Sequence, residues 1–187
     1  MEAIETLMAE HRIILRGCDA LQSFAEEVRR GGGEPAELAR FVAFIREFAD
    51  AHHHAKEENF LFAAMVEAGF PKEAGPIAVM LFEHDAGRRH VAELAELAGR
   101  TSPWTGEDRE RVSAAAIGYA DLLRGHIHKE DAILYPMAEQ RLPAPLARSV
   151  DDQAAAFEAA HAADRERLEA LGGELVRRHA PPLAATA

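Results

Sequence analysis

Two stretches of the sequence repeat a spacing of histidine and glutamate that could bind a metal ion. His53 lies four residues before Glu57, and His126 lies four residues before Glu130. On a helix, residues four apart lie on one face, one turn from each other. A neutral imidazole and a carboxylate placed in this way can hold a cation together. One such pair arises readily by chance on a surface helix, so the informative feature is the repetition.

The repeat extends to a third pair of positions. His11 ends the sequence Ala-Glu-His, and His84 ends the sequence Phe-Glu-His. The step along the chain from His11 to His84 equals the step from one His-x-x-x-Glu pair to the other, so all three pairs share one register. This shared register favours metal ligands over solvated surface pairs or hydrogen-bonded core histidines. It predicts two helical hairpins, each with a histidine on its first helix and a His-x-x-x-Glu pair on its second.

The predicted ligands lie on the apolar stripes of their helices, so we expect them to be buried together. An ionised carboxylate without a partner costs several kcal/mol to bury, and a bound metal offsets that cost. Imidazole and carboxylate together suit iron, zinc or manganese better than calcium or copper(I). The single cysteine, Cys18, excludes an intrachain disulfide and a thiolate zinc or iron–sulfur site. It is expected to be a small core residue.

The elements that must position these residues are long helices. Apolar residues recur at helical spacing over about residues 2–30, 34–68, 76–98, 106–141 and 150–179, and glycine- or proline-containing segments separate them. No convincing strand is found. The pattern predicts an all-α protein, an up-down-up-down four-helix bundle over residues 1–141. Residues 142–187 are expected to add a C-terminal helix that packs on the bundle and a short flexible tail.

Composition limits the class of protein. The chain has 187 residues and a formal net charge of −11, which argues against nucleic acid or an anionic membrane surface as partner. Its first residues lack the basic start and apolar run of a signal peptide. No segment reaches the roughly 20 apolar residues that span a bilayer. These features predict a cytoplasmic protein.

With its His, His-x-x-x-Glu, His, His-x-x-x-Glu series, the chain resembles the hemerythrin-like family of HHE cation-binding domains over about residues 1–141. The resemblance implies a four-helix bundle with an oxo- or hydroxo-bridged centre of two iron ions, with zinc or manganese as alternatives. It implies that His11 and His53 hold one iron and that His84 and His126 hold the other. Glu57 and Glu130 would bridge the two ions.

The chain departs from the oxygen-carrying hemerythrins at two positions. Those proteins have a second histidine one turn after the ligand on the third helix, where this chain has Arg88. Their carboxylate spacing would select Asp131 in place of Glu130. The chain therefore resembles the six-ligand bacterial branch, with an additional open position that a water or His161 could fill.

Other residues near the motifs are predicted to support the ligands, to pack in the core or to lie on the surface. Glu58 and Asp131 are expected to point outward or to support the ligands from behind. Tyr119 could hydrogen-bond a metal-bound oxygen or simply belong to the core. Surface positions are predicted for His52, His54, His90 and His128. His161 is expected to lie on the surface or to support the ligands from behind. Packing that walls the site from water is predicted for Leu61, Phe62, Leu134 and Tyr135.

The leading functional hypothesis is a di-iron protein that binds a diatomic ligand, oxygen or nitric oxide, for sensing or a stress response. The alternative is a di-iron enzyme or iron donor that turns over peroxide or nitric oxide, or repairs iron centres. A third hypothesis is an interaction module in which the metal only stabilises the bundle. Under this third hypothesis, a protein partner would bind the acidic surface or the C-terminal helix. No catalytic residue is assigned, and whether the protein is an enzyme stays open.

Overall fold

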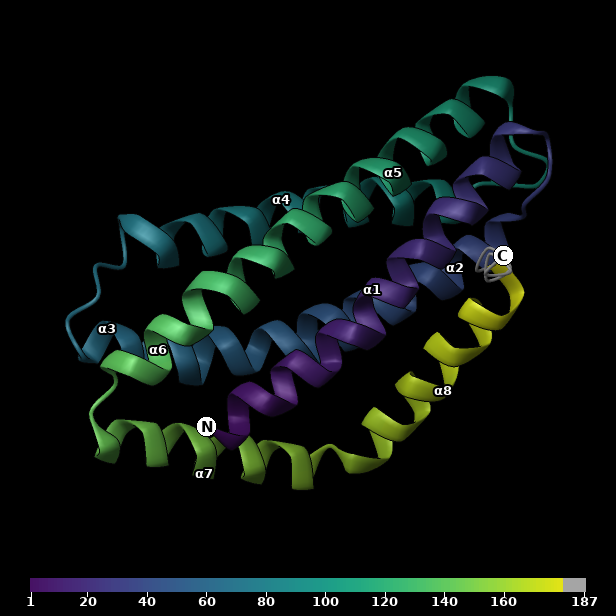
Figure 1. The fold of residues 1–187 in the computed structure, drawn as a ribbon. Coiled ribbons are helices and arrows are strands. Elements are labelled where there is room, and N and C mark those ends of the chain that lie inside the picture. Colours follow the sequence, from purple (N-terminus) through teal and green to yellow (C-terminus); the bar gives the residue numbers. More distant parts are fainter. Residues whose placement is uncertain (180–187) are drawn as a thin grey trace, which may run out of the picture.

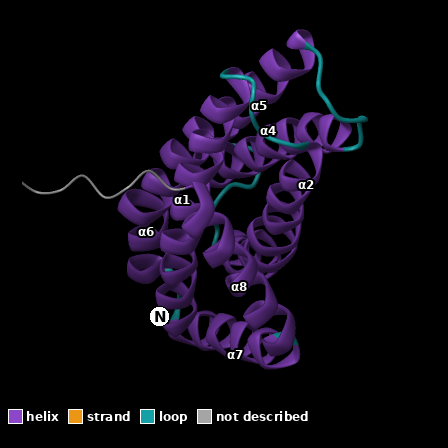
Figure 2. Ribbon diagram, turned by 90° about the vertical axis from the view of Figure 1, so that its right-hand side faces the viewer, coloured by secondary structure: helices purple, strands orange, loops and turns teal. Residues whose placement is uncertain are grey.

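The protein is helical throughout the part of the chain that the structure, a computed structural model, describes, residues 1–179 (Figures 1 and 2). No strand occurs in that range, so the all-α prediction is confirmed. The first helix is α1, Glu2–Arg29, and the third long helix is α4, Gly75–Ala98. The predicted flexible tail, residues 180–187, lies outside the described residues. Within residues 1–179, no helix is both long and apolar enough to cross a membrane.

The other two long helical segments are composite. The first consists of α2, Pro35–Phe44, two π-helical stretches, η1, Ile45–His54, and η2, Glu57–Leu61, and finally α3, Phe62–Glu67. The second consists of α5, Gly106–Lys129, the π-helical stretch η3, Glu130–Leu134, and α6, Tyr135–Arg141. In a π-helix the backbone bonds span five residues, and such stretches are frequent at functional sites. Both η2 and η3 begin at a predicted bridging glutamate.

Local sequence explains where these helices begin and end. Thr105 caps α5: its hydroxyl accepts from the Asp108 N–H, and the Asp108 carboxylate accepts from the Thr105 N–H. α2 begins with Pro35, whose missing N–H costs nothing in a first turn. α1 ends at a turn in which Gly31 adopts φ 95°, a conformation that favours glycine.

The C-terminal segment forms two helices, so the prediction of one helix over about 150–179 is wrong. α7 spans Ala144–Ala160 and α8 spans Ala162–His179. The helix is interrupted at His161, whose ring Nδ1 donates a hydrogen bond to the Phe157 carbonyl oxygen at 2.8 Å. Figure 1 shows α7 crossing the end of the molecule near the N-terminus, while α8 turns back alongside the other helices. There α8 packs on α1 and α2, so the segment covers mainly the first half of the chain.

α8 approaches the first half closely through a glycine. A Cβ on Gly172 would lie 2.6 Å from the ring of Phe44, closer than two such atoms can approach. A Cβ on Gly17 of α1 would likewise lie 2.7 Å from the same ring. The Phe44 ring is therefore enclosed between two glycines, which lets α1, α2 and α8 pack tightly.

The apolar core is divided into two clusters. One contains Phe24, Phe41 and Leu123 and lies toward α8, and the other contains Leu7, Leu61 and Leu134 and lies toward α7. Along each helical segment the predicted metal ligands lie at or next to the boundary between the two clusters. A band of buried polar side chains therefore crosses the bundle with apolar packing on both sides, which excludes bulk water from it.

Candidate metal centre

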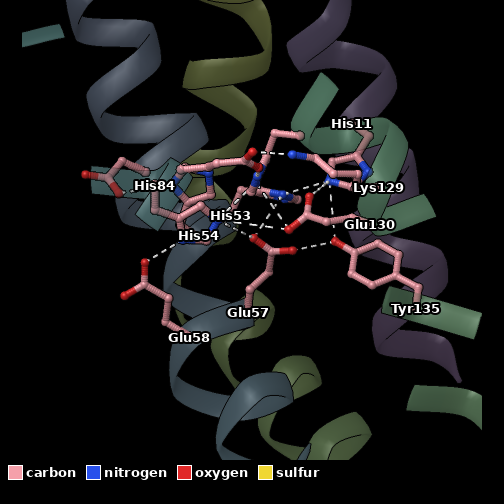
Figure 3. A network of polar contacts seen from close by, with 12 residues as sticks. His11, His53, His54, Glu57, Glu58, His84, Lys129, Glu130 and Tyr135 are labelled. Carbon is pink, nitrogen blue, oxygen red and sulfur yellow. Dashed lines mark hydrogen bonds and ion pairs between the residues drawn. The ribbon is translucent and has the colours of Figure 1, made fainter. Parts of the chain in front are cut away.

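The six predicted ligands come together inside the bundle. Figure 3 labels all of them except His126. All six are buried, with at most 2% of each side chain exposed. Together with His54, which was not a predicted ligand, they form two groups that share Glu57, and within each group the ligand atoms lie within 4.8 Å of one another. The first group is His11, His53, Glu57 and Glu130, and the second is His54, Glu57, His84 and His126.

The imidazoles pair within each half of the chain. The Nε2 atoms of His11 and His53 are 3.1 Å apart, and those of His84 and His126 are also 3.1 Å apart. When two nitrogens bind the same ion through bonds of about 2.1 Å that meet at a right angle, the nitrogens lie about 3 Å apart. Each pair therefore has a spacing that suits one metal ion.

The two buried glutamates connect the imidazole pairs. Glu130 Oε2 lies 3.3 Å from His11 Nε2, and its Oε1 lies 3.2 Å from His126 Nε2. Glu57 Oε2 lies 3.6 Å from the Nε2 atoms of both His53 and His84. Glu130, and not its neighbour Asp131, is the carboxylate that faces the centre.

Three oxygens of these glutamates lack a hydrogen-bond partner. They are Glu57 Oε2 and both carboxylate oxygens of Glu130. Among the residues that the structure describes, no other buried side-chain nitrogen or oxygen lacks a hydrogen-bond partner. A buried polar atom without a partner costs about 1–3 kcal/mol, more if it is charged. Cations at the two groups would satisfy all three, so the donor set fits a pair of metal ions.

Each predicted histidine ligand is oriented from behind by a second carboxylate. The Nδ1 atom of His11 contacts Asp131 at 2.8 Å, and that of His84 contacts Glu58 at 2.7 Å. Both carboxylates come from the opposite half of the chain. Glu58 and Asp131 were expected either to point outward or to support the ligands from behind, and in the structure they support the ligands. A carboxylate on the far nitrogen fixes the ring and its tautomer, as is usual for metal-binding histidines.

Two supporting glutamates were missed in the sequence. His53 Nδ1 contacts Glu10 Oε2 at 2.8 Å, and His126 Nδ1 contacts Glu83 Oε2 at 3.0 Å. Glu10 and Glu83 directly precede the single histidines and therefore occupy equivalent positions in the two halves, so the repeat contained the signal that could have found them.

Lysines neutralise these two glutamates, and here the halves differ. Lys56 pairs with Glu10 and is 2% exposed, whereas Lys129 pairs with Glu83 and is 36% exposed. Lys56 is covered because Glu158 of α7 also pairs with it. The C-terminal segment therefore encloses the supporting network of the first half and leaves that of the second half open to solvent.

Tyr135 was predicted to be plain packing, but its hydroxyl reaches the centre. It donates to Glu57 Oε1 at 2.5 Å and lies 3.4 Å from His11 Nε2. The equivalent residue in the first half of the repeat is Phe62, whose ring lies near His84 and has no hydroxyl. The polar contact exists only on the side of the centre near His11.

The prediction that His52 and His54 lie on the surface is wrong. Both are buried, at 4% and 6% exposure, on either side of His53. The physical reason is tertiary packing: His52 is covered by α7, where its Nε2 lies 3.1 Å from Glu158 Oε1 and its ring packs on Phe157. His54 is covered by α4, where its ring stacks on that of His84. His128 is exposed as predicted, and His90 is half-buried.

The remaining candidates lie outside the two ligand groups. His161 stacks on Phe157 and belongs to neither group. The Cys18 thiol is buried in the core, and burial raises its pKa to about 12, which agrees with the predicted packing role. Tyr119 belongs to the core and also lines a cavity of about 220 Å³. That cavity reaches His54, with Asp50 and Arg88 on its wall.

Electrostatics in the metal-free centre favour a mixture of protonated and neutral groups. Burial alone would lower the pKa of His11, but the carboxylates of Asp131 and Glu130 outweigh burial and raise it to about 9. Burial lowers the pKa of His53 to about 4. Burial and the neighbouring Glu130 raise the pKa of Glu57 well above its usual value. At neutral pH His11 therefore carries a proton that a metal ion must displace, and the raised pKa of Glu57 favours its protonated form in the same way.

Metal binding is expected to release protons between pH 7 and 9. Because the pKa of His11 is raised to about 9, fewer chains hold this proton as the pH rises, so the affinity for metal should increase with pH across this interval. Calorimetric titration with zinc, repeated in buffers of different ionisation enthalpy, would count the protons. An affinity that is flat from pH 7 to 9, with no proton released, would contradict the prediction.

Comparisons with known proteins agree with this geometry. The family described as hemerythrin HHE cation binding domain matches residues 2–138. The iron–sulfur cluster repair protein DnrN of Neisseria gonorrhoeae is 38% identical over 109 residues, which cover 54% of this chain and 65% of that protein. The iron–sulfur cluster repair protein YtfE of Yersinia pseudotuberculosis is 35% identical over 122 residues, which cover 61% of this chain and 54% of that protein. The matched part thus spans about half to two thirds of these relatives. No solved structure matches significantly.

Proposed function

Because the chain belongs to the hemerythrin HHE cation-binding domain family, we propose that it holds two iron ions and supplies iron for the repair of iron–sulfur clusters. The observation that carries the proposal is the pair of buried ligand groups that share Glu57. The similarity to iron–sulfur cluster repair proteins supports this alternative hypothesis more than the sensing of oxygen or nitric oxide.

In this proposal His11 and His53 hold one ion, His84 and His126 hold the other, and Glu57 and Glu130 lie between them. Iron would supply a cation that changes oxidation state and exchanges its ligands. We also propose that residues 1–141 form the up-down-up-down four-helix unit typical of the family, with the C-terminal segment as a cover.

The metal-free centre supports a role in which iron leaves the protein. When iron is absent, His11 is protonated and lies 3.3 Å from Glu130, so the two charges offset each other. The raised pKa of Glu57 favours its neutral form, and Glu57 Oε1 accepts a hydrogen bond from Tyr135. Protons at these two residues thus offset part of the charge that the metal ions would bring, which lowers the cost of releasing the iron.

Iron transfer can be tested with the iron-loaded protein and an iron-depleted ferredoxin, in the presence of sulfide and a thiol reductant. We expect the cluster absorbance of the ferredoxin to return while this protein loses an equal amount of iron. Zinc-loaded protein is the control and should restore nothing. Equal recovery with the zinc-loaded protein, or iron that stays bound throughout, would contradict the proposed function.

The cavity beside the centre favours a second candidate function, the binding of a small ligand. It reaches His54, and Tyr119, Val91 and Leu123 give it a largely apolar wall. Its volume of about 220 Å³ would admit oxygen, nitric oxide or peroxide. Exposure of the reduced, iron-loaded protein to nitric oxide or oxygen should then change its visible spectrum reversibly. A spectrum that changes only as iron is lost would favour the repair function alone.

A further inference from the structure

His54 shares the arrangement of the four predicted histidine ligands. In each of those four the ring Nδ1 contacts a carboxylate oxygen, at distances of 2.7 to 3.0 Å. His54 is the fifth case, because its Nδ1 lies 3.2 Å from Asp50 Oδ1. This contact leaves Nε2 as the atom that can bind a cation, as in the other four.

The neighbouring His52 differs from this arrangement although it is equally buried. Its Nε2 lies 3.1 Å from Glu158 and 3.4 Å from Glu10, so the far end of its ring is already engaged by carboxylates. The ring of His54 instead stacks on that of His84, with a centroid distance of 3.7 Å. Burial in η1 alone therefore does not explain where His54 points.

The Asp50 carboxylate that holds His54 is itself fixed from another helix. The Arg88 guanidinium on α4 donates to Asp50 at 2.7 Å and to Glu58 at 2.8 Å. Glu58 in turn holds His84. A His–Asp pair four residues apart is often a plain surface contact, but here Arg88 connects the two carboxylates behind two adjacent rings.

We infer that His54 is a fifth histidine ligand of the metal centre and binds the same ion as His84 and His126. A ring nitrogen of His54 lies within 4.8 Å of the ligand atoms of His84, His126 and Glu57. The inference rests on the metal centre proposed above and corrects its ligand set from six to seven.

The fifth ligand makes the two ions unequal. The residue equivalent to His54 in the second half of the repeat is Ile127, so the ion at His11 and His53 has no matching imidazole. That ion has two histidines and the Tyr135 hydroxyl nearby, whereas the other has three histidines. The open position therefore lies at the ion held by His11 and His53.

Metal binding to a His54→Gln variant tests the inference. We expect its affinity for one of the two ions to fall by at least about 10- to 100-fold, the loss usual even for a supporting residue. Its metal content should then fall from two ions per chain toward one after dialysis against a chelator. His90→Gln, on α4 and outside both ligand groups, is the control and should keep wild-type content. A His54→Gln protein that keeps both ions at wild-type affinity would overturn the inference.

A direct count of ligands covers the case in which the variant does not fold. In the cobalt(II)-loaded wild-type protein, each ligand histidine should give one strongly shifted, solvent-exchangeable Nδ1–H proton signal. Five such signals would support the inference and four would overturn it, because five Nδ1–carboxylate contacts surround the centre. A wild-type protein that binds neither iron, zinc nor cobalt would overturn the proposed function as well.

Discussion

Replacement of Glu57 by glutamine is expected to remove most of the bound metal while leaving the metal-free fold about as stable as the wild type. Glu57 is the carboxylate shared by both ligand groups, so its loss weakens both ions. In the metal-free protein its raised pKa favours the neutral carboxylic acid, which a glutamine resembles in shape and charge. The glutamine oxygen can still accept the hydrogen bond that Tyr135 donates to Glu57.

Two measurements check this prediction. Elemental analysis should show metal loss in Glu57→Gln, and thermal unfolding in chelator should give nearly the same midpoint for variant and wild type. Glu139→Gln, a change to an exposed glutamate on α6, should alter neither result. A variant that keeps two ions would show that Glu57 is not a shared ligand. A large loss of metal-free stability would show that its charge holds the fold together.

Removal of the metal from the wild-type protein should lower its unfolding midpoint by about 10–20 °C. Two ions, each present at about 100 times its dissociation constant, would stabilise the native state by about 5 kcal/mol. One kcal/mol shifts the midpoint by about 2–4 °C in a chain of this size. The metal also relieves the cost of the buried, unpartnered oxygens of Glu57 and Glu130.

Calorimetry of the metal-loaded protein, with and without chelator, measures this effect. Amide hydrogen exchange would show which segments are stabilised. The largest increase in exchange rate on metal removal is expected in η1, η2 and η3, which carry His53, Glu57 and Glu130. The Glu57→Gln variant should show almost no response to chelator. An equal response in variant and wild type would mean that the stabilising ion binds elsewhere.

The supporting residues show how the repeated halves act on each other. Asp131 of the second half holds His11 of the first, and Glu58 of the first half holds His84 of the second. Neither hairpin can orient all of its own ligands. The two hairpins therefore depend on each other through contacts behind the metal as well as through the metal itself.

The internal repeat and the helical pattern were enough to predict the helical class and to select six side chains that the structure brings together. This was possible because helical periodicity and ligand spacing are both local properties, read directly from residues such as His53 and Glu57. The same repeat also contained Glu10 and Glu83, whose positions before the single histidines could have identified them as supporting residues.

Tertiary structure alone decided the features that break the repeat. His54 is buried because its ring stacks on that of His84, which belongs to another helix and lies 30 residues further along the chain. Tyr135 differs from Phe62 by one hydroxyl, which matters only because Glu57 lies 2.5 Å away. Glu158 covers Lys56 because α7 folds across the first half. Such contacts join residues distant in sequence, and only the packing of helices sets their distances.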